Sequence, residues 1–275
     1  MAQAKRKERM AEELTVDGAT AESAAPEGGA ETGAWQKPQG LTPRGWAIIV
    51  GLAVVLNAPL IHYYLLRSAP EATASLPFSD DFENPGTVEK NYWSSGGFWR
   101  TVNGELLSPG VKNNPLWLKA KLPQNVAVEF DVKSMSPEGD VKVEIFGDGT
   151  DHASGYVLIH GGWNNTMSVI ARLDEHGAPL YQLQAEAKGQ DLVKSGVFKK
   201  DTRMRVEGTH RRVEIAKSTH WRIERRGSVI SWYLDGQKYM EFDDPIPLVG
   251  DKHDRFAFSS WEAQLYFDNL SITPL

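Results

Sequence analysis

The chain has 275 residues, no cysteine and a formal net charge of −6. The absence of cysteine excludes disulfides, thiolate metal sites and cysteine nucleophiles. From residue 68 onward, 23 Lys and Arg stand against 29 Asp and Glu. This acidic balance excludes nucleic acid as an expected partner, because binding to phosphates requires clustered positive charge.

The first 45 residues are rich in Ala, Glu and Gly and show no hydrophobic period. A segment of this composition cannot bury enough apolar surface to offset the entropy lost on ordering. We therefore expect residues 1–45 to form a disordered tail.

Residues 46–66 form a run of 21 residues without Asp, Glu, Lys or Arg. A helix of this length spans about 30 Å, which is the thickness of the hydrocarbon core of a bilayer. Trp46 at one end and Tyr63 and Tyr64 at the other suit the two membrane interfaces. The run therefore predicts a transmembrane helix rather than a buried core helix. A cleaved signal peptide is the rival interpretation. Residues 1–45 would then be its N-terminal basic region, and 45 residues are far more than such a region has.

Basic residues predict the orientation of this helix. Six Lys and Arg precede the run, whereas only Arg67 follows it closely. Because basic residues flank membrane helices on the cytoplasmic side, we expect a cytoplasmic N-terminus and an extracytoplasmic C-terminal domain.

Three residues, Asn57, Pro59 and His62, interrupt the apolar run. Pro59 lacks a backbone donor and is expected to kink the helix, while Asn57 can bond a freed carbonyl or another helix. His62 is either solvated at the interface or an axial ligand to a pigment or haem held by a partner. Polar groups at this depth indicate a neighbouring helix, so we expect docking against a membrane protein in the same bilayer. The alternative is a simple tether.

After a linker at residues 67–77, residues 78–275 read as an all-β domain. Apolar and polar residues alternate in 126–133 and again in 141–145, which predicts two strands lying side by side in one sheet. Asn103-Gly104 and Asp235-Gly236 favour the tight turns of β-hairpins. Only Lys188–Glu207 lacks a strand pattern. Short strands without interleaved helices predict a β-sandwich.

Six segments carry a resemblance to a known family: Phe78-Ser-Asp-Asp-Phe82, Gly97-Phe-Trp99, Val102-Asn-Gly-Glu-Leu106, His220-Trp-Arg-Ile-Glu-Arg225, Trp232-Tyr-Leu-Asp-Gly236 and Tyr266-Phe-Asp-Asn-Leu270. Residues 78–275 resemble the concanavalin A-like lectin/glucanase superfamily, above all its laminin-G-like branch and bacterial domains of the 3-keto-disaccharide hydrolase-like kind. The resemblance implies a jelly-roll sandwich that binds glycans on its concave sheet or on a rim of loops. With the predicted anchor, it implies the inner membrane of a bacterium, with the sandwich in the periplasm.

Glucanases of this superfamily carry a Glu-x-Asp-x-Glu strand that places three carboxylates on one face. This chain has Glu129-Phe-Asp131-Val-Lys133, in which Lys133 replaces the third carboxylate. Glu144 supplies another acid only if strand pairing brings it to about 5–9 Å from the others. We therefore favour a protein that is not an enzyme. The alternative is a glycan-cleaving hydrolase that uses Glu129, Asp131 and Glu144.

A structural calcium ion is the one cofactor that the sequence suggests. Asp81 and Glu83 lie at the first strand and Asp268 in the last. First and last strands of a jelly roll tend to be neighbours, and oxygen-rich loops suit Ca²⁺. The alternative is that these carboxylates bond across the paired strands.

Sugar binding requires flat aromatic faces beside amides and carboxylates. His160-Gly-Gly-Trp163-Asn164-Asn165 supplies these groups in one predicted loop, so we expect His160, Trp163, Asn164 and Asn165 to bind a ligand. The alternative for any one Trp is core packing. The basic stretch 194–217 is either a solvated loop or a surface for an acidic protein, an anionic glycan or lipid headgroups.

The sequence thus predicts a membrane-anchored, non-catalytic binding or docking module. Two roles remain open at this point. One is an accessory subunit of a membrane protein complex, with an energy-converting complex as one candidate, and the other is a glycan-binding module.

Overall fold

The computed structural model describes residues 40–66, 68–94 and 96–275. Most of the expected disordered tail, residues 1–39, lies outside this part of the chain. Helix α1 (Pro43–Ile61) begins three residues before the predicted start at residue 46 and is followed by a π-helical turn, η2 (His62–Leu66). With a mean hydropathy of 1.8 and none of its apolar window buried, α1 is long and apolar enough to cross a membrane.

Helix α1 contains Pro59 and continues through it to Ile61. Pro59 has no N–H for the carbonyl of Val55, four residues earlier. The side-chain amide of Asn57 donates instead to the carbonyl of Ala53 at 2.7 Å. Asn57 therefore bonds within its own helix, but not to the carbonyl that Pro59 leaves without its usual donor.

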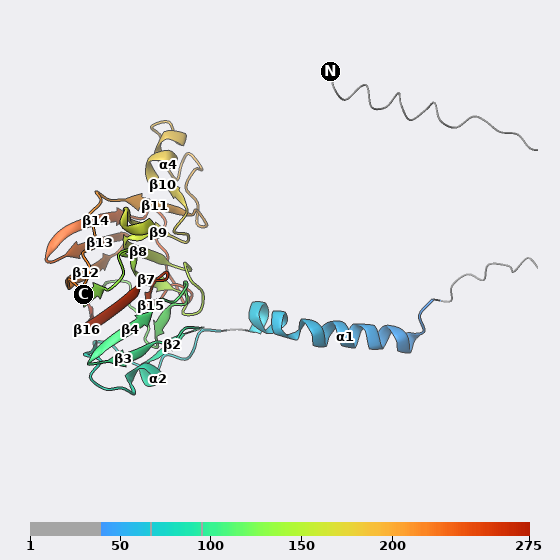
Figure 1. The fold of residues 1–275 in the computed structure, drawn as a ribbon. Helices are drawn as coiled ribbons and strands as arrows, with labels where there is room; N and C mark the ends of the chain where they lie inside the picture. The colour runs from blue at the N-terminus through green and yellow to red at the C-terminus, as the bar shows by residue number, and fades with distance from the viewer. Residues whose placement is uncertain (1–39, 67, 95) are drawn as a thin grey trace, which may run out of the picture. The chain divides into compact units, whose positions relative to one another are not determined.

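The described residues from 68 onward form two eight-stranded sheets that pack face to face (Figure 1). Sheet A has the order β14 (Gln237–Asp243), β13 (Val229–Leu234), β12 (Thr219–Arg226), β6 (Val126–Ser134), β16 (Gln264–Pro274), β4 (Glu105–Pro109) and β3 (Arg100–Val102), and β1 (Phe78–Asp80) also pairs with β16. Sheet B has the order β10 (Ala178–Pro179), β11 (Met204–Glu207), β9 (Met167–Arg172), β8 (Tyr156–Gly161), β7 (Val141–Gly147), β15 (Arg255–Ser259), β5 (Leu116–Leu118) and β2 (Tyr92–Ser94). Three short helices complete the fold: α2 (Thr87–Asn91), α3 (Gly162–Asn165) and α4 (Leu180–Glu186).

The all-β jelly-roll sandwich predicted from the sequence is confirmed. Both Asn-Gly and Asp-Gly turns form hairpins, between β3 and β4 and between β13 and β14. Their four residues all have positive φ, 52° and 78° in the first turn and 50° and 75° in the second. These are the conformations that make Asn, Asp and Gly favoured there.

The core lies between the two sheets and is built by the alternation along each strand. In β6 the apolar residues Val128, Phe130 and Val132 face the other sheet and are buried. The ring of Phe130 contacts Trp221 and Phe258, with centroids 5.4 and 5.5 Å away. Aromatic packing of this kind dominates the energetics of a core.

One expectation about pairing is wrong. Strand β6 pairs with β12 and β16 in sheet A, whereas β7 pairs with β8 and β15 in sheet B. The two alternating strands are consecutive in the chain but belong to different sheets. Because each turns its apolar face to the shared core, their polar faces point to opposite sides of the sandwich.

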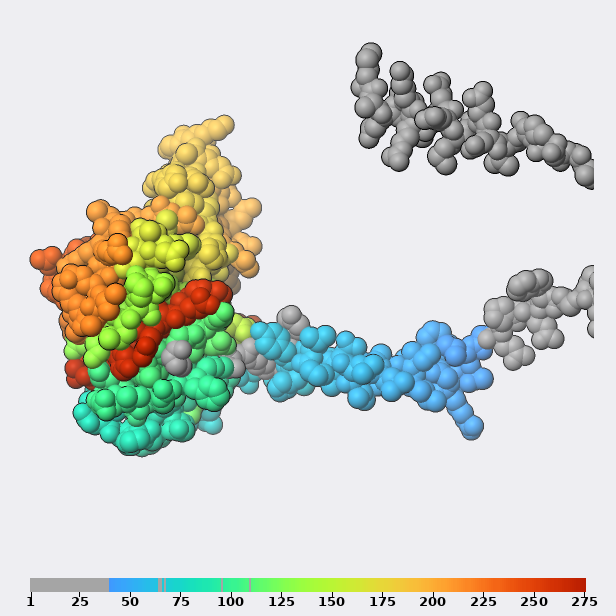
Figure 2. All heavy atoms as spheres, viewed as in Figure 1, coloured from blue at the N-terminus to red at the C-terminus, as the bar shows by residue number. Residues whose placement is uncertain are grey.

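Residues 180–203, here called the arm, project from the sandwich and contain α4 (Figures 1 and 2). The sequence indicated irregular structure at Lys188–Glu207. The structure has turns up to residue 201, but Met204–Glu207 forms strand β11 at the side of β9.

A buried network fastens the base of the arm to sheet B. The fully buried guanidinium of Arg172 donates to Asp244 Oδ2 at 2.7 Å, and the hydroxyl of Tyr156 donates to the same oxygen at 2.6 Å. The other guanidinium nitrogens donate at 2.8 to 3.0 Å to the carbonyls of Thr202, Lys200 and Ile246. One side chain thereby joins β9, the arm and the segment after β14.

The segment before β1 is also fastened to the sandwich. The backbone amides of Thr73 and Ala74 both donate to the carbonyl of Lys119 at 2.9 Å. The guanidinium of Arg255 donates to the carbonyl of Pro70 at 3.3 Å. Part of the predicted linker therefore lies against sheet B where β5 ends and β15 begins.

Replacing Arg172 by Met is expected to lower the free energy of unfolding by about 3–5 kcal/mol, because it leaves the Asp244 carboxylate buried without its charged partner. Urea unfolding followed by tryptophan fluorescence measures the loss. The matched control is Arg203→Met, because Arg203 forms an ion pair with Asp174 but is 69% exposed, and its loss should cost less than about 1 kcal/mol. Equal effects of the two substitutions would contradict the importance given to the buried network.

Candidate binding site on the outer face of sheet B

A pocket of about 420 Å³ lies over β7 and β8, on the side of sheet B that faces away from the core. This volume is in the usual range for small-molecule sites. Loops from distant parts of the chain surround it, and eleven residues line it: Asn113, Glu138, Asp140, Lys142, Ile159, Trp163, Asn164, Glu175, His176, Trp261 and Glu262.

Lys142 lies at the bottom of the pocket. Its position in β7 turns it away from the core, as the alternation predicts, yet the residue is only 1% exposed. Its ammonium lies 2.9 Å from Glu175 Oε2 and donates to Asn113 Oδ1 at 3.0 Å. A buried charge persists only with such partners, because removing it from water costs several kcal/mol.

A second pair of buried charges lies beside Lys142. Glu144, two residues along β7, accepts from His152 Nδ1 at 2.6 Å and from the backbone amide of Ala153 at 2.8 Å. The other imidazole nitrogen of His152 lies 3.5 Å from Glu175. Lys142, Glu175, His152 and Glu144 thus form a chain of alternating charge, here called the charge chain. It holds the loops at 148–154 and 173–177 against the outer face of sheet B.

Protonation follows from this arrangement. Burial alone lowers the pKa of His152, but the charge of Glu144 and hydrogen bonds with Glu144 and Glu175 raise it to about 9. Burial raises the pKa of Glu175, but the hydrogen bond with His152 and the charge of Lys142 lower it to about 2. At neutral pH both groups are therefore charged.

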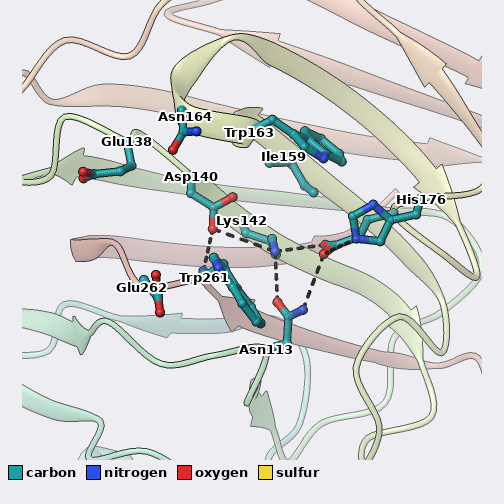
Figure 3. A pocket seen from close by; sticks show the side chains of 11 residues that line it. Asn113, Glu138, Asp140, Lys142, Ile159, Trp163, Asn164, His176, Trp261 and Glu262 are labelled. Atoms are coloured by element: carbon teal, nitrogen blue, oxygen red, sulfur yellow. Dashed lines mark hydrogen bonds and ion pairs between the residues drawn. The ribbon is translucent and has the colours of Figure 1, made fainter.

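Two indole rings flank the pocket. Figure 3 shows Trp163 and Trp261 on opposite sides of Asp140 and Lys142. Trp261 is 46% exposed, and the ring of Trp163 stands edge-on to His176 with centroids 5.8 Å apart. The site therefore offers aromatic surface on two sides and polar atoms between them.

The turn that carries Trp163 is strained. Trp163, Asn164 and Asn165 have φ of 51°, 59° and 60° in the left-handed region. A bulky residue in this region is an outlier, and such strain concentrates at functional sites. The conformation places Trp163 and Asn164 at the pocket.

Asp140 connects the bottom of the pocket to Trp261. Its Oδ2 accepts from the backbone amide of Trp261 at 2.5 Å and lies 3.8 Å from the Lys142 ammonium. Burial raises the pKa of Asp140, and the charge of Lys142 opposes this shift. Among the described residues no donor bonds to its second oxygen, Oδ1, which carries no dashed line in Figure 3.

Of the four ligand-binding residues predicted from the sequence, Trp163 and Asn164 line the pocket, whereas His160 and Asn165 do not. The side chain of Asn165 is buried, accepts from the amide of Val213 at 2.9 Å and donates to its carbonyl at 2.8 Å. The Asn165 side chain therefore fastens the strained turn to the backbone of Val213 and does not face the pocket.

His160 lies on the core side of β8, because alternation places it opposite to its neighbour Ile159. Its ring is within 6.1 and 6.2 Å of Trp221 and Trp232, and Nε2 donates to the carbonyl of Arg211 at 2.7 Å. Its expected place in a ligand loop is therefore corrected to a place in the core.

The structure does not bring together the three carboxylates of the alternative catalytic set. Glu129 and Asp131 lie on the outer face of sheet A, where Glu129 bonds with Arg222 and Asp131 with His220. Glu144 lies on the outer face of sheet B, so the strand pairing that the alternative required to bring it to about 5–9 Å from the others does not form. The cause is the placement of β6 and β7 in different sheets.

The carboxylates considered for calcium lie around the pairing of β1 and β16, which are neighbours as expected. Burial raises the pKa of Asp268, and the charges of Glu105, Asp131 and Asp81 raise it further. In the described part of the chain, no three His, Cys, Asp or Glu residues form a metal-binding group. Calcium bound by Asp81, Glu83 and Asp268 stays a prediction from the sequence.

No protein-family model matches the chain, and no curated protein matches it. Among solved structures, the carbohydrate-binding module CBM66 from Bacillus subtilis is 12% identical, with a TM-score of 0.45 over 66% of this chain and 95% of that one. LamAcat from Zobellia galactanivorans is 13% identical, with a TM-score of 0.45 over 74% and 98%. A protein of unknown function with a galectin-like fold from Bacillus subtilis is 10% identical, with a TM-score of 0.45 over 72% and 94%. At these identities the similarity concerns the fold alone.

The buried His160 is expected to make the sandwich acid-sensitive. Burial lowers its pKa from 6.5 to about 4. A histidine with a depressed folded-state pKa contributes stability above its unfolded pKa, and the contribution is lost as pH falls from 6.5 towards 4. The variant His160→Phe should therefore lose less stability than the wild type between pH 6.5 and 4.5, as measured by urea unfolding at each pH.

Between pH 6.5 and 4.5, the effect of His160 on stability can be measured apart from the effects of the charge chain. The raised pKa of His152 contributes stability below pH 6.5 that is lost only as pH rises through about 9. The lowered pKa of Glu175 contributes above pH 4.5 and is lost only as pH falls through about 2. Equal pH slopes for wild type and His160→Phe would refute the assignment.

Proposed function

We propose that the chain is a membrane-anchored, non-catalytic binding module whose sheet B pocket takes a carbohydrate. The observation that carries the proposal is the pair of indole rings, Trp163 and Trp261, on two sides of a polar pocket of about 420 Å³. Aromatic faces pack against the C–H surfaces of a sugar ring, while fixed amides and carboxylates bond its hydroxyl groups. Asn164, Asp140 and Glu138 supply such groups at the pocket.

The charges at the bottom of the pocket argue against hydrolysis. A glycosidase needs two carboxyl groups about 5–9.5 Å apart with the scissile bond between them. In this pocket the Lys142 ammonium lies between Asp140 and Glu175, 3.8 and 2.9 Å from their oxygens. A pKa of about 2 also prevents Glu175 from donating a proton at neutral pH. Both features support binding without cleavage.

Substituting either indole by alanine is expected to weaken oligosaccharide binding about three- to tenfold, the loss expected for one aromatic contact. The measurement is calorimetric titration of the full chain in detergent with neutral and charged oligosaccharides, comparing Trp163→Ala and Trp261→Ala with wild type. The matched control is Phe98→Ala, because Phe98 is an aromatic residue that is 86% exposed and lies outside the pocket.

Unchanged affinity in both tryptophan variants would contradict the assignment of the pocket. Release of reducing sugar from any bound oligosaccharide would contradict the absence of catalysis.

A second role, docking against a membrane protein partner, is supported by the polar residues of α1. Asn57 and Pro59 interrupt an apolar helix whose surface is exposed along its length. The Asn57 amide donates within the helix, and its carbonyl oxygen can accept from a neighbouring helix. We propose that α1 spans the inner membrane of a bacterium, with a cytoplasmic N-terminus and a periplasmic sandwich, as an accessory subunit of a membrane complex.

Replacing Asn57, Pro59 and His62 together by Leu is expected to reduce recovery of the partner, because interhelical hydrogen bonds contribute on the order of 0.6–2 kcal/mol in membranes. The measurement is quantitative recovery of the complex after gentle detergent extraction. The control replaces three valines of the same helix, Val50, Val54 and Val55, by Leu. Undiminished recovery with the first variant would show that α1 is a tether alone.

A further inference from the structure

Most of the charges around the sheet B pocket are matched. The charge chain pairs Lys142 with Glu175 and His152 with Glu144. At the rim, Glu262 forms an ion pair with Lys112 at 2.6 Å. None of these carboxylates needs a ligand to balance its charge.

Two carboxylates at the same pocket remain without a close cationic partner. Asp140 Oδ1 accepts no hydrogen bond from the described residues, and the Lys142 ammonium is 3.8 Å from the other oxygen. Glu138 is exposed at the rim, and the described residues provide it with no hydrogen bond or ion pair. Both residues belong to the loop between β6 and β7, and both line the pocket on the side of Asn164 (Figure 3).

Lys142 is the one Lys or Arg among the described residues that line the pocket, and it is not free to bind an anionic ligand. The Lys142 side chain is only 2% exposed, and Glu175 and Asn113 already take its ammonium. An anionic sugar would therefore face two unmatched carboxylates, whereas a cation would face them together with the negative faces of two indole rings.

We propose that the pocket selects an amino sugar, whose protonated amine bonds with Asp140 Oδ1 while the charge of Glu138 at the rim adds attraction and the sugar ring packs against Trp163 or Trp261. This inference rests on the proposed carbohydrate function and names the class of sugar. The ammonium gains a charge-assisted hydrogen bond with an Asp140 oxygen that accepts none from the described residues. The faces of the two indoles attract a cation that comes within about 6 Å of them.

The test uses three trisaccharides of different charge with the full chain in detergent: the β-1,4-linked glucosamine trimer, its fully N-acetylated form, and a galacturonic acid trimer. Calorimetric titration at low salt is expected to show the glucosamine trimer binding about fivefold tighter than the acetylated trimer, which is the effect of one exposed ion pair. The galacturonic acid trimer should bind weakest. The preference for the amine should shrink as salt increases.

Two variants assign the preference to the two carboxylates. Glu138→Gln and Asp140→Asn should each reduce the affinity for the glucosamine trimer about threefold more than they reduce that for the acetylated trimer. Asn at position 140 keeps an oxygen that accepts from the amide of Trp261. The control Glu186→Gln removes an exposed carboxylate of α4 outside the pocket and should change neither affinity.

Equal affinities for the glucosamine and acetylated trimers, or tighter binding of the galacturonic acid trimer, would overturn the inference and leave carbohydrate binding intact. Failure of all three trimers to bind would overturn both the inference and the proposed function.

Discussion

The pocket depends on the charge chain of Lys142, Glu175, His152 and Glu144 on the outer face of sheet B. Strand β7 places an ammonium and a carboxylate on a face that is buried under loops, where neither is stable alone. Each of the two charged groups pairs with a residue from a loop: Lys142 with Glu175, and Glu144 with His152. Because loss of one partner leaves a buried charge uncompensated, at a cost of about 3–5 kcal/mol, the loops are fixed together with the charges.

The same charge chain supports the proposal that the pocket binds a ligand without cleaving it. The ammonium that supports the bottom of the pocket also lies between Asp140 and Glu175, the two carboxylates that are closest to a hydrolytic pair. On the other sheet, Glu129 and Asp131 are engaged with Arg222 and His220 on a flat face. Glu129, Asp131 and Glu175 therefore act as structural partners, whereas Asp140 and Glu138 are the acceptors that we propose for a ligand.

Local features of the fold were predictable from the sequence, whereas pairing between distant segments was not. Turn chemistry predicted the hairpins at Asn103-Gly104 and Asp235-Gly236, because it depends on adjacent residues alone. Alternation correctly predicted which residues of β6 and β7 face inward. It carried no information on which strand lies beside which, so the two strands were expected in one sheet.

The site shows the same limit. The Gly-rich sequence around Trp163 was a local signal for an exposed aromatic ring, and Trp163 lines the pocket. Trp261, Asp140 and Glu175 come from other loops, and only the folded sheet brings them together. Alternation places Lys142 on the outer side of β7, but it does not reveal the loops that cover this residue, because a sequence pattern distinguishes only the core side of a strand from the other side. Extending the alternation of inward and outward residues along β8 to residue 160 would have placed His160 on the core side.

The central claim is that a carbohydrate occupies the space between Trp163 and Trp261. The most direct measurement is nuclear magnetic resonance of the full chain with ¹⁵N-labelled indoles, titrated with the oligosaccharide that binds. The chain has nine tryptophans, so their indole signals report on several places at once. The account predicts that the signals of Trp163 and Trp261 shift with saturation, while those of the buried Trp117, Trp221 and Trp232 do not. Saturating shifts confined to other tryptophans, with Trp163 and Trp261 unmoved, would contradict it.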